Sequence, residues 1–330
     1  MMKSSKLGII GVGHVGKAVL TNLLRTTFFN EYILIDTRED RVFGEALDQN
    51  HGTGALNHHN FKIRNGTYDD LVDADMIIVA ASYYYGDNIL PNLERQELLE
   101  DNIPELQQIM EGIMGATQEA ILIFVSNPVD TWTQLAITEF GYPKEKCMGT
   151  GTMLETARLR YTLAKHYQVD PKIVSTYMMG EHGNAAFMVP SHTHIAGIPF
   201  DDLDTFFPQE SALNVADLNQ EIVEAAGVVY DNKNGVTDAA IGIVTIELVQ
   251  AIVLDEQTIL PLTSLHPVGT YSSKRELCFG MPTKVGINGI ENRYELPLSD
   301  WESQKLEKSL QVIADSVDKG KELLMKRKDQ

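Results

Sequence analysis

The chain has 330 residues and a formal net charge of −19 at pH 7, with 43% hydrophobic and 22% charged residues. This composition is ordinary for a folded globular protein, and the length is sufficient for two domains that each have a core. A strongly acidic chain repels phosphate backbones and anionic lipids, so the overall charge argues against electrostatic binding of nucleic acid or membranes.

Two cysteines, Cys147 and Cys278, are too few for a disulfide framework or a cysteine metal cluster. Both are expected to be buried thiols in a reducing compartment. The adjacent His58 and His59 lack spaced cysteine or carboxylate partners, so no metal site is predicted. The N-terminus lacks a secretory pattern, and no apolar run reaches the roughly 18 residues that span a bilayer. A cytoplasmic location is therefore expected.

The first part of the chain alternates short apolar runs with helical patterns. Strands are predicted at residues 7–11, 32–36, 76–82 and 120–128, with helices from about 14 to 26 and from Arg95 onward. Continuous apolar strands separated by helices indicate a parallel sheet that is covered on both faces. The sequence therefore predicts an α/β fold, with a parallel-sheet domain over residues 1–148.

The order of elements changes after about residue 149. Helices are predicted at 152–166, between 213 and 254, and at 299–325, with shorter strands between them up to about residue 287. This mixture predicts a second domain of mixed α+β type over residues 149–330, packed closely against the first.

A glycine-rich loop, GVGHVG, lies between the first predicted strand and helix. Gly11 permits a tight turn, Gly13 lets a pyrophosphate approach the backbone, and Gly16 lets the helix pack close to the sheet. Asp36 ends the next strand, where a carboxylate accepts hydrogen bonds from the adenosine ribose and repels a 2′-phosphate. The loop and Asp36 together predict a Rossmann domain that binds NAD rather than NADP.

Four other polar side chains are candidates for catalytic or substrate-binding roles: His182, Glu155, Arg158 and Arg95. His182 lies between glycines in GEHGN, where a histidine can exchange protons near neutral pH, although a structural histidine is the commoner case. Glu155 and Arg158 lie three positions apart on a predicted helix, a spacing that fits either a surface ion pair or a substrate site. Arg95 follows a tyrosine-bearing loop, whose tyrosines fit core packing as well as function.

These segments together resemble the L-lactate/malate dehydrogenase superfamily from about residue 6 to about residue 325. The matching motifs, in the family's order and spacing, are GVGHVG, Asp36, SNPVD (126–130), GTGTMLETAR (149–158), GEHGN (180–184) and NGVT (234–237). Within the superfamily the chain is most similar to the L-2-hydroxyisocaproate dehydrogenases, which act on larger 2-hydroxy acids. The stretch from Ala80 to Arg95 has a length typical of that branch, and GEHGN ends in its Asn184.

The resemblance implies reduction of a 2-oxo acid by hydride transfer from NADH. His182 would donate the proton, and Glu155 would orient its ring. Arg158 would bind the substrate carboxylate through its planar pair of donors. Arg95, on a loop that closes over the substrate, would stabilise negative charge on the carbonyl oxygen.

The resemblance also implies the surroundings of the reacting atoms. Asn127 would help to position the nicotinamide and the substrate oxygen, and Thr237 would line the substrate pocket. The expected cofactor site consists of Gly11, Gly13, Val15, Gly16, Asp36, Ser126 and Asn127. A homotetramer or homodimer is expected, with a small 2-oxo or 2-hydroxy acid as substrate.

The chain departs from the family pattern at three places. The family normally has Asp where this chain has Glu155, and one extra methylene could displace the carboxylate by about 1 Å. Arg160 matches one residue of the fructose 1,6-bisphosphate site of activated lactate dehydrogenases, but Ser175 replaces its histidine, so activation is not expected. The loop at 81–94 has no Arg or Lys for a second carboxylate, which disfavours malate.

The leading interpretation is an NAD-dependent L-2-hydroxyacid dehydrogenase that acts on a 2-oxoisocaproate-type acid or on pyruvate and lactate. If the longer loop folds outward, an L-lactate dehydrogenase proper is the alternative. A non-catalytic NAD-binding protein is favoured by Glu155 alone. An unrelated nucleotide-binding enzyme, such as a methyltransferase, leaves GEHGN and the arginines unexplained.

Overall fold

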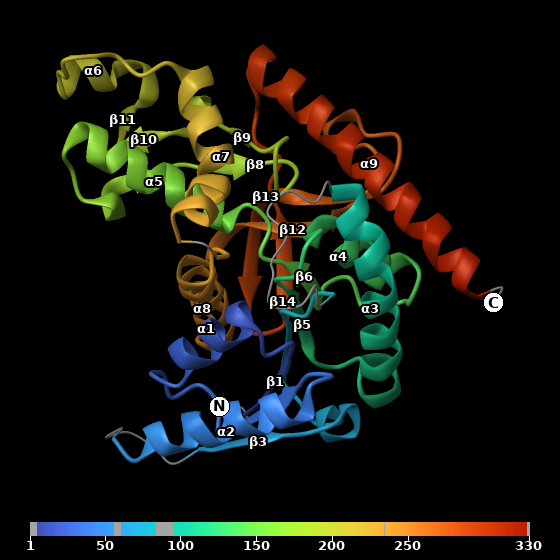
Figure 1. Ribbon diagram of the computed structural model, residues 1–330. Coiled ribbons are helices and arrows are strands. Elements are labelled where there is room, and N and C mark those ends of the chain that lie inside the picture. Colours follow the sequence, from blue (N-terminus) through green and yellow to red (C-terminus); the bar gives the residue numbers. More distant parts are fainter. Residues whose placement is uncertain (1–4, 56–60, 84–94, 234, 329–330) are drawn as a thin grey trace.

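One large sheet runs through both halves of the chain. The computed structural model describes residues 5–55, 61–83, 95–233 and 235–328 (Figure 1). In this part of the chain the sheet has nine strands, in the order β14-β13-β12-β6-β5-β4-β1-β2-β3. Its parallel strands are β1 (Lys6–Ile10), β2 (Glu31–Ile35), β3 (Lys62–Asn65), β4 (Met76–Val79), β5 (Ile121–Phe124) and β6 (Cys147–Gly149). Its antiparallel strands are β12 (Ile259–His266), β13 (Leu277–Gly286) and β14 (Gly289–Arg293).

The strand order reverses between β1 and β4, which lie side by side at the middle of the parallel part. Ile10 pairs with Val79 there, so the residues that follow both strands meet at one edge of the sheet. In open parallel sheets, ligands bind at such a reversal, beyond the carboxyl ends of the strands. The register therefore brings the glycine loop after Ile10 next to the segment that begins at Ala80.

Helices cover both faces of the sheet (Figure 1). On one face lie α1 (His14–Leu23), α2 (Glu39–Thr53) and α8 (Ala239–Val253). On the other face lie α3 (Arg95–Ala116), α4 (Val129–Thr138) and α9 (Asp300–Lys328), where α9 packs along α3 and α4. Because helices cover both faces, the loops that follow the parallel strands are left accessible at the carboxyl edge of the sheet, next to residues of the second half.

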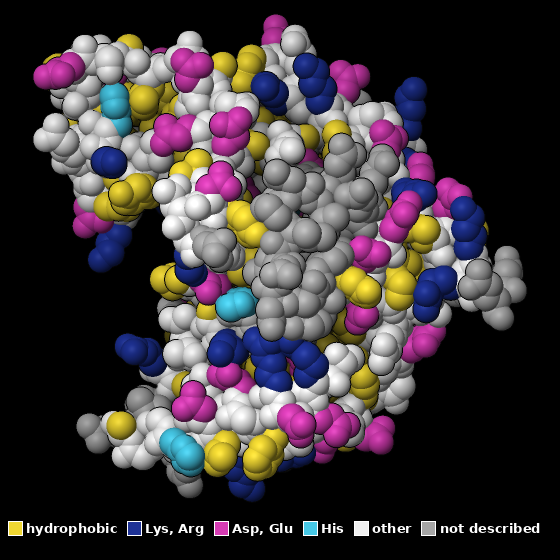
Figure 2. Space-filling view, viewed as in Figure 1, with side chains coloured by type: hydrophobic (Ala, Val, Ile, Leu, Met, Phe, Trp, Pro, Cys, Tyr) yellow, Lys and Arg dark blue, Asp and Glu magenta, His cyan; other side chains and the backbone are white. Residues whose placement is uncertain are grey.

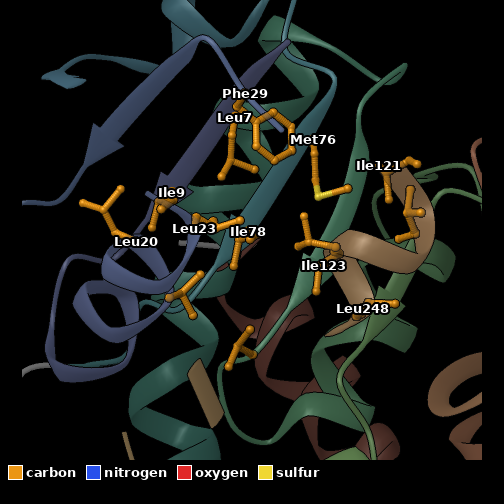
Figure 3. Packing of buried hydrophobic residues seen from close by; sticks show 14 of the residues in the cluster. Leu7, Ile9, Leu20, Leu23, Phe29, Met76, Ile78, Ile121, Ile123 and Leu248 are labelled. Atoms are coloured by element: carbon orange, nitrogen blue, oxygen red, sulfur yellow. The ribbon is translucent and has the colours of Figure 1, made fainter. Parts of the chain in front are cut away.

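Strand side chains alternate between the two cores. Leu7 and Ile9 belong to the same buried cluster as Leu20 of α1 and Leu248 of α8 (Figure 3), whereas Ile10 joins the opposite cluster with α3 and α4. This alternation follows from the two-residue period of a strand. Because both faces are covered, successive strand residues are apolar, which is the pattern that the sequence displays.

A smaller lobe is built from the second half of the chain, at the upper left of Figure 1. Its helices are α5 (Met153–Tyr167), α6 (Leu203–Phe206) and α7 (Val215–Lys233). Its short strands are β7 (Val174–Ser175), β8 (Met178–Met179), β9 (Phe187–Met188), β10 (His194–Ile195) and β11 (Ile198–Pro199). They form two small sheets, β11-β10-β7 and β8-β9.

The predicted α/β fold, with a Rossmann sheet and a mixed second half, is confirmed, but the sequence patterns miss four elements: β3, β6, α2 and α4. β3 has only Ile63 buried, and β6 is only three residues long, so neither gives an apolar run. α2 is polar on average and buries only Val42 and Ala46. The two halves share the sheet, since Gly149 of β6 pairs with Thr263 of β12. The domain boundary expected between residues 148 and 149 stays a prediction.

Three of the sequence-based expectations concern membrane-spanning helices, the surface charge and the two cysteine thiols. No helix within the described residues is long and apolar enough to cross a membrane. Acidic side chains are spread over the face in Figure 2, and so are Lys and Arg side chains, of which one group lies below the centre of the view. Cys147 and Cys278 are both buried, and burial raises the pKa of Cys278 well above its usual range.

Candidate active site

Two adjoining cavities lie at the carboxyl edge of the parallel strands. The larger, of about 800 Å³, is lined by most of the predicted catalytic and substrate residues, namely Asn127, Glu155, Arg158, His182 and Thr237, and by Ser126 of the predicted cofactor site. The smaller, of about 500 Å³, is lined by Gly11, Gly13 and Asp36. Val15 and Ala80 line both cavities, so the two are continuous. The fold thus gathers residues that lie far apart in the sequence.

The glycine loop of the smaller cavity has the geometry expected for a pyrophosphate site. Gly11 has φ of +90°, and a Cβ there would lie 2.3 Å from the Ala81 nitrogen, so no larger residue fits. A Cβ on Gly16 would lie 2.0 Å from the Gly11 oxygen. A Cβ on Gly13 would meet no heavy atom within 4 Å, so the space in front of the α1 N-terminus is open to a ligand.

Asp36 contacts this loop from the end of the next strand. Its Oδ2 accepts a hydrogen bond from the Val12 N–H (2.8 Å), and its Oδ1 accepts one from the Arg38 N–H (3.1 Å) and lies 3.3 Å from Arg38 Nε. Burial raises the pKa of Asp36, but these hydrogen bonds outweigh burial and the net pKa lies below its usual range. The group is therefore a carboxylate at neutral pH, as recognition of ribose hydroxyls requires.

His182, Glu155 and Arg158 meet in the larger cavity. Nδ1 of His182 lies 3.0 Å from Oε1 of Glu155, and Nη1 of Arg158 lies 3.7 Å from the same oxygen. Glu155 is nearly fully buried, which raises its pKa, but the charges of His182 and Arg158 outweigh burial and the net pKa is lowered. A buried carboxylate that stays charged beside an imidazole favours the protonated ring.

The longer side chain of Glu155 thus reaches the histidine at hydrogen-bond distance. The expected displacement of about 1 Å does not leave the two groups apart. Glu155 lies in the first turn of α5 and Arg158 one turn later, so the helix presents both groups to the cavity. The position of the N-terminal end of α5 therefore determines where both the Glu155 carboxylate and the Arg158 guanidinium lie.

The main chain around His182 is tied to three separate elements. Gly180 exchanges two backbone hydrogen bonds with Gly280 of β13 (2.9 and 2.8 Å). The Glu181 N–H donates to Ser309 Oγ of α9 (2.6 Å), and the His182 N–H donates to Asp130 Oδ2 of α4 (2.7 Å). The sequence patterns did not single out Ser309 or Asp130, although SNPVD contains Asp130.

Some predicted residues are placed only in part. α3 begins at Arg95, but the Arg95 side chain lies outside the described residues, as do Tyr84 and Tyr85. Tyr83 is 44% exposed and lines both cavities. Ser126, expected at the cofactor, donates its hydroxyl to the Val79 and Ala81 carbonyls and so joins the ends of β5 and β4.

No three His, Cys, Asp or Glu side chains converge on a possible metal position among the residues that the structure describes. His58 and His59 lie outside them. The absence of a metal centre stays a prediction. The cavity of the glycine loop opens directly onto the cavity that holds His182, Glu155 and Arg158, an arrangement expected of a dinucleotide-dependent oxidoreductase.

Comparison with known proteins agrees with this class. Residues 5–149 match the family model for the lactate/malate dehydrogenase NAD-binding domain, and residues 152–324 match that for the alpha/beta C-terminal domain of the same family. The chain therefore belongs to the lactate/malate dehydrogenase family and is an L-lactate dehydrogenase-like oxidoreductase with NAD as its cofactor.

Individual relatives match over nearly their whole length. The chain is 37% identical over 322 residues to an L-lactate dehydrogenase of Selenomonas ruminantium, covering 96% of this chain and 98% of that protein. It is 38% identical over 307 residues to L-lactate dehydrogenase 2 of Clostridium acetobutylicum, covering 92% and 94%. The crystal structure of a minor L-lactate dehydrogenase from Enterococcus mundtii has a TM-score of 0.87 at 30% identity, covering 96% and 98%.

Proposed function

We propose that this protein is an L-2-hydroxyacid dehydrogenase that reduces pyruvate, or a 2-oxo acid with a larger apolar side chain, to the L-2-hydroxy acid. The observation that carries the proposal is the meeting of His182, Glu155 and Arg158 in a cavity that opens onto the dinucleotide site. A protein that only binds NAD needs no buried carboxylate between a histidine and an arginine. The relatives named L-lactate dehydrogenase support the pyruvate and lactate pair.

Each residue has one task in this reaction. The Arg158 guanidinium holds the substrate carboxylate with two parallel hydrogen bonds. Because Nδ1 of His182 faces Glu155, Nε2 is the nitrogen that we assign to the proton donated to the carbonyl oxygen. NADH, when bound, supplies the hydride to the carbonyl carbon. Glu155 stabilises the His182 imidazolium before the proton is transferred, and the His182 ring is neutral afterwards.

Other residues place the reacting groups. Asn127 and Thr237 line the same cavity, and we assign the nicotinamide side to Asn127 and the substrate side to Thr237. We assign Arg95 to the carbonyl oxygen on the resemblance alone. Val15, between the two cavities, is assigned to the cofactor.

A larger substrate than pyruvate is the second candidate. It is favoured by the length of the loop at 81–94 and by Tyr83, which lies on the cavity wall at the start of that loop. Malate remains disfavoured, because the loop sequence has no cation for a second carboxylate. Insensitivity to fructose 1,6-bisphosphate, a cytoplasmic location and a homotetramer or homodimer stay predictions.

The deciding experiment measures NADH oxidation with pyruvate, 2-oxoisocaproate, phenylpyruvate and oxaloacetate in parallel. A higher kcat/KM for pyruvate identifies an L-lactate dehydrogenase, and a higher value for the bulky acids identifies the hydroxyisocaproate type. NADH binding without turnover of any of the four acids would refute the proposal in favour of a non-catalytic protein.

A matched pair of variants tests the carboxylate site. Arg158→Lys keeps the charge but loses the planar pair of donors, so the KM for the oxo acid should rise about 10- to 100-fold, the effect of one charged hydrogen bond. Arg160→Lys makes the same change two residues further along α5, outside the cavity lining, and should leave KM unchanged. Equal effects of the two variants would contradict the assignment of Arg158.

A further inference from the structure

The ring and the main chain of His182 are held from different sides of the cavity. Glu155 of α5 lies at Nδ1 of the ring, whereas the main-chain N–H of His182 donates to Asp130 of α4. The ring contact stays within the second half of the chain. The main-chain contact crosses to the half that carries the dinucleotide site.

The acceptor of this main-chain hydrogen bond, Asp130, is a buried carboxylate. Its side chain is 4% exposed, and a buried charge is costly unless hydrogen bonds and nearby dipoles compensate it. Oδ2 accepts from the His182 N–H, and Oδ1 accepts from the hydroxyl of Thr263, a fully buried residue of β12. Asp130 also lies in the first turn of α4, where the helix dipole favours a negative group.

The position of Asp130 in the chain gives the contact a consequence. Asn127, the residue assigned to the nicotinamide side, lies just before α4, and Asp130 is the second residue of that helix. Only two residues therefore lie between Asn127, on the cofactor side, and Asp130, which accepts from the His182 main chain. Asp130 also lines the same cavity as Asn127 and His182.

We propose that Asp130 is a positioning residue that fixes His182 relative to Asn127, so that the proton donor and the hydride donor approach one carbonyl group together. The inference rests on the proposed function. Thr263 supports the role, because its hydroxyl fixes the second oxygen of Asp130 and hence the direction of the first. In this role Asp130 acts through the His182 main chain.

The test compares three variants with the wild type, using pyruvate or the best acid of the panel. Asp130→Ala removes the acceptor and should lower kcat about 10- to 100-fold, the effect of a misplacement near 1 Å. KM for the oxo acid and the Kd of NADH should stay within about threefold, because Arg158 and the glycine loop are untouched. Asp130→Asn keeps an oxygen acceptor of the same size and should restore most of kcat.

Thr263→Val and Thr133→Val form the matched pair. Both remove a buried hydroxyl without a change of shape, but Thr263 donates to Asp130, whereas Thr133 donates to the Val129 carbonyl of its own helix. Thr263→Val should lower kcat several-fold, and Thr133→Val should not. If Asp130→Ala fails to fold, this pair and Asp130→Asn decide the question.

A readout that does not depend on turnover separates this inference from the proposed function. Amide hydrogen exchange of the peptide spanning residues 180–184 should become faster in Asp130→Ala and stay unchanged in Thr133→Val. A wild type without activity but with this exchange pattern would refute only the proposed function. Unchanged exchange and kcat in Asp130→Ala, or an equal loss of NADH affinity and kcat, would overturn the role of Asp130.

Discussion

Replacement of Glu155 by Gln tests the charge that the structure places beside His182. The substitution preserves size and leaves an oxygen 3.0 Å from Nδ1, but it removes the negative charge. Oε2 of Glu155 is buried and accepts no hydrogen bond from the described residues. A Gln amide at that position therefore leaves a buried donor unsatisfied, which should lower the free energy of unfolding by about 1–3 kcal/mol.

The kinetic effect follows from the protonation state. An opposite charge within about 4–6 Å shifts a pKa by roughly 1–3 units. Without it, the imidazole holds its proton only at lower pH. In the reduction direction, which needs the protonated ring, the high-pH limb of the activity curve should move down by about 1–3 pH units, or tenfold in rate per unit on that limb. Oxidation of the hydroxy acid, which needs the neutral ring, should be less affected.

The assay is steady-state NADH oxidation from about pH 5 to 9, with kcat and KM determined at each pH. KM for the oxo acid should not rise, because Arg158 loses a competing carboxylate at 3.7 Å. A uniform loss of kcat without movement of the limb would refute the role of the charge. A higher KM with unchanged kcat would show that Glu155 serves Arg158 instead of His182.

Three further changes test other parts of the structure. Glu155→Asp, which restores the family's usual residue, should withdraw the carboxylate from His182 and lower kcat about 10- to 100-fold without moving the pH limb; an equal or higher kcat would show that the loop follows the shorter side chain. Asp36→Ser should raise the NADPH-to-NADH ratio of kcat/KM at least about tenfold, because it removes a like charge from the 2′-phosphate position, where Arg38 and Arg41 line the cavity; an unchanged ratio would place the ribose elsewhere. Burial lowers the pKa of His266 from its ordinary value of 6.5 to about 3. Between these two pH values only the unfolded state takes up the proton, so the free energy of unfolding decreases as the pH is lowered. The wild type should therefore lose about 2 kcal/mol between pH 6.5 and 5 that His266→Gln retains, as measured by urea unfolding; parallel losses would show that another group is responsible.

The sequence by itself determined those features whose cause is local. Uninterrupted apolar runs such as LGII and MIIV can be satisfied only by strands covered on both faces, so the parallel sheet follows from them. Gly11 and Asp36 likewise carry their chemistry in a strand–loop–helix segment, and the dinucleotide site is readable without coordinates. β3, β6 and α2 lack a strong apolar pattern. Strand pairing with β2 and β5 stabilises β3 and β6, and α2 packs against β3.

Only the tertiary structure decided how distant groups meet. Glu155 and His182 lie 27 positions apart and Asp130 and His182 lie 52 apart, and no local period relates them. Whether the extra methylene of Glu155 separates or joins the two groups depends on where α5 starts relative to the GEHGN loop. The packing of α5, α4 and β13 around that loop fixes those distances, because a close-packed interior allows one arrangement where the sequence alone allows several.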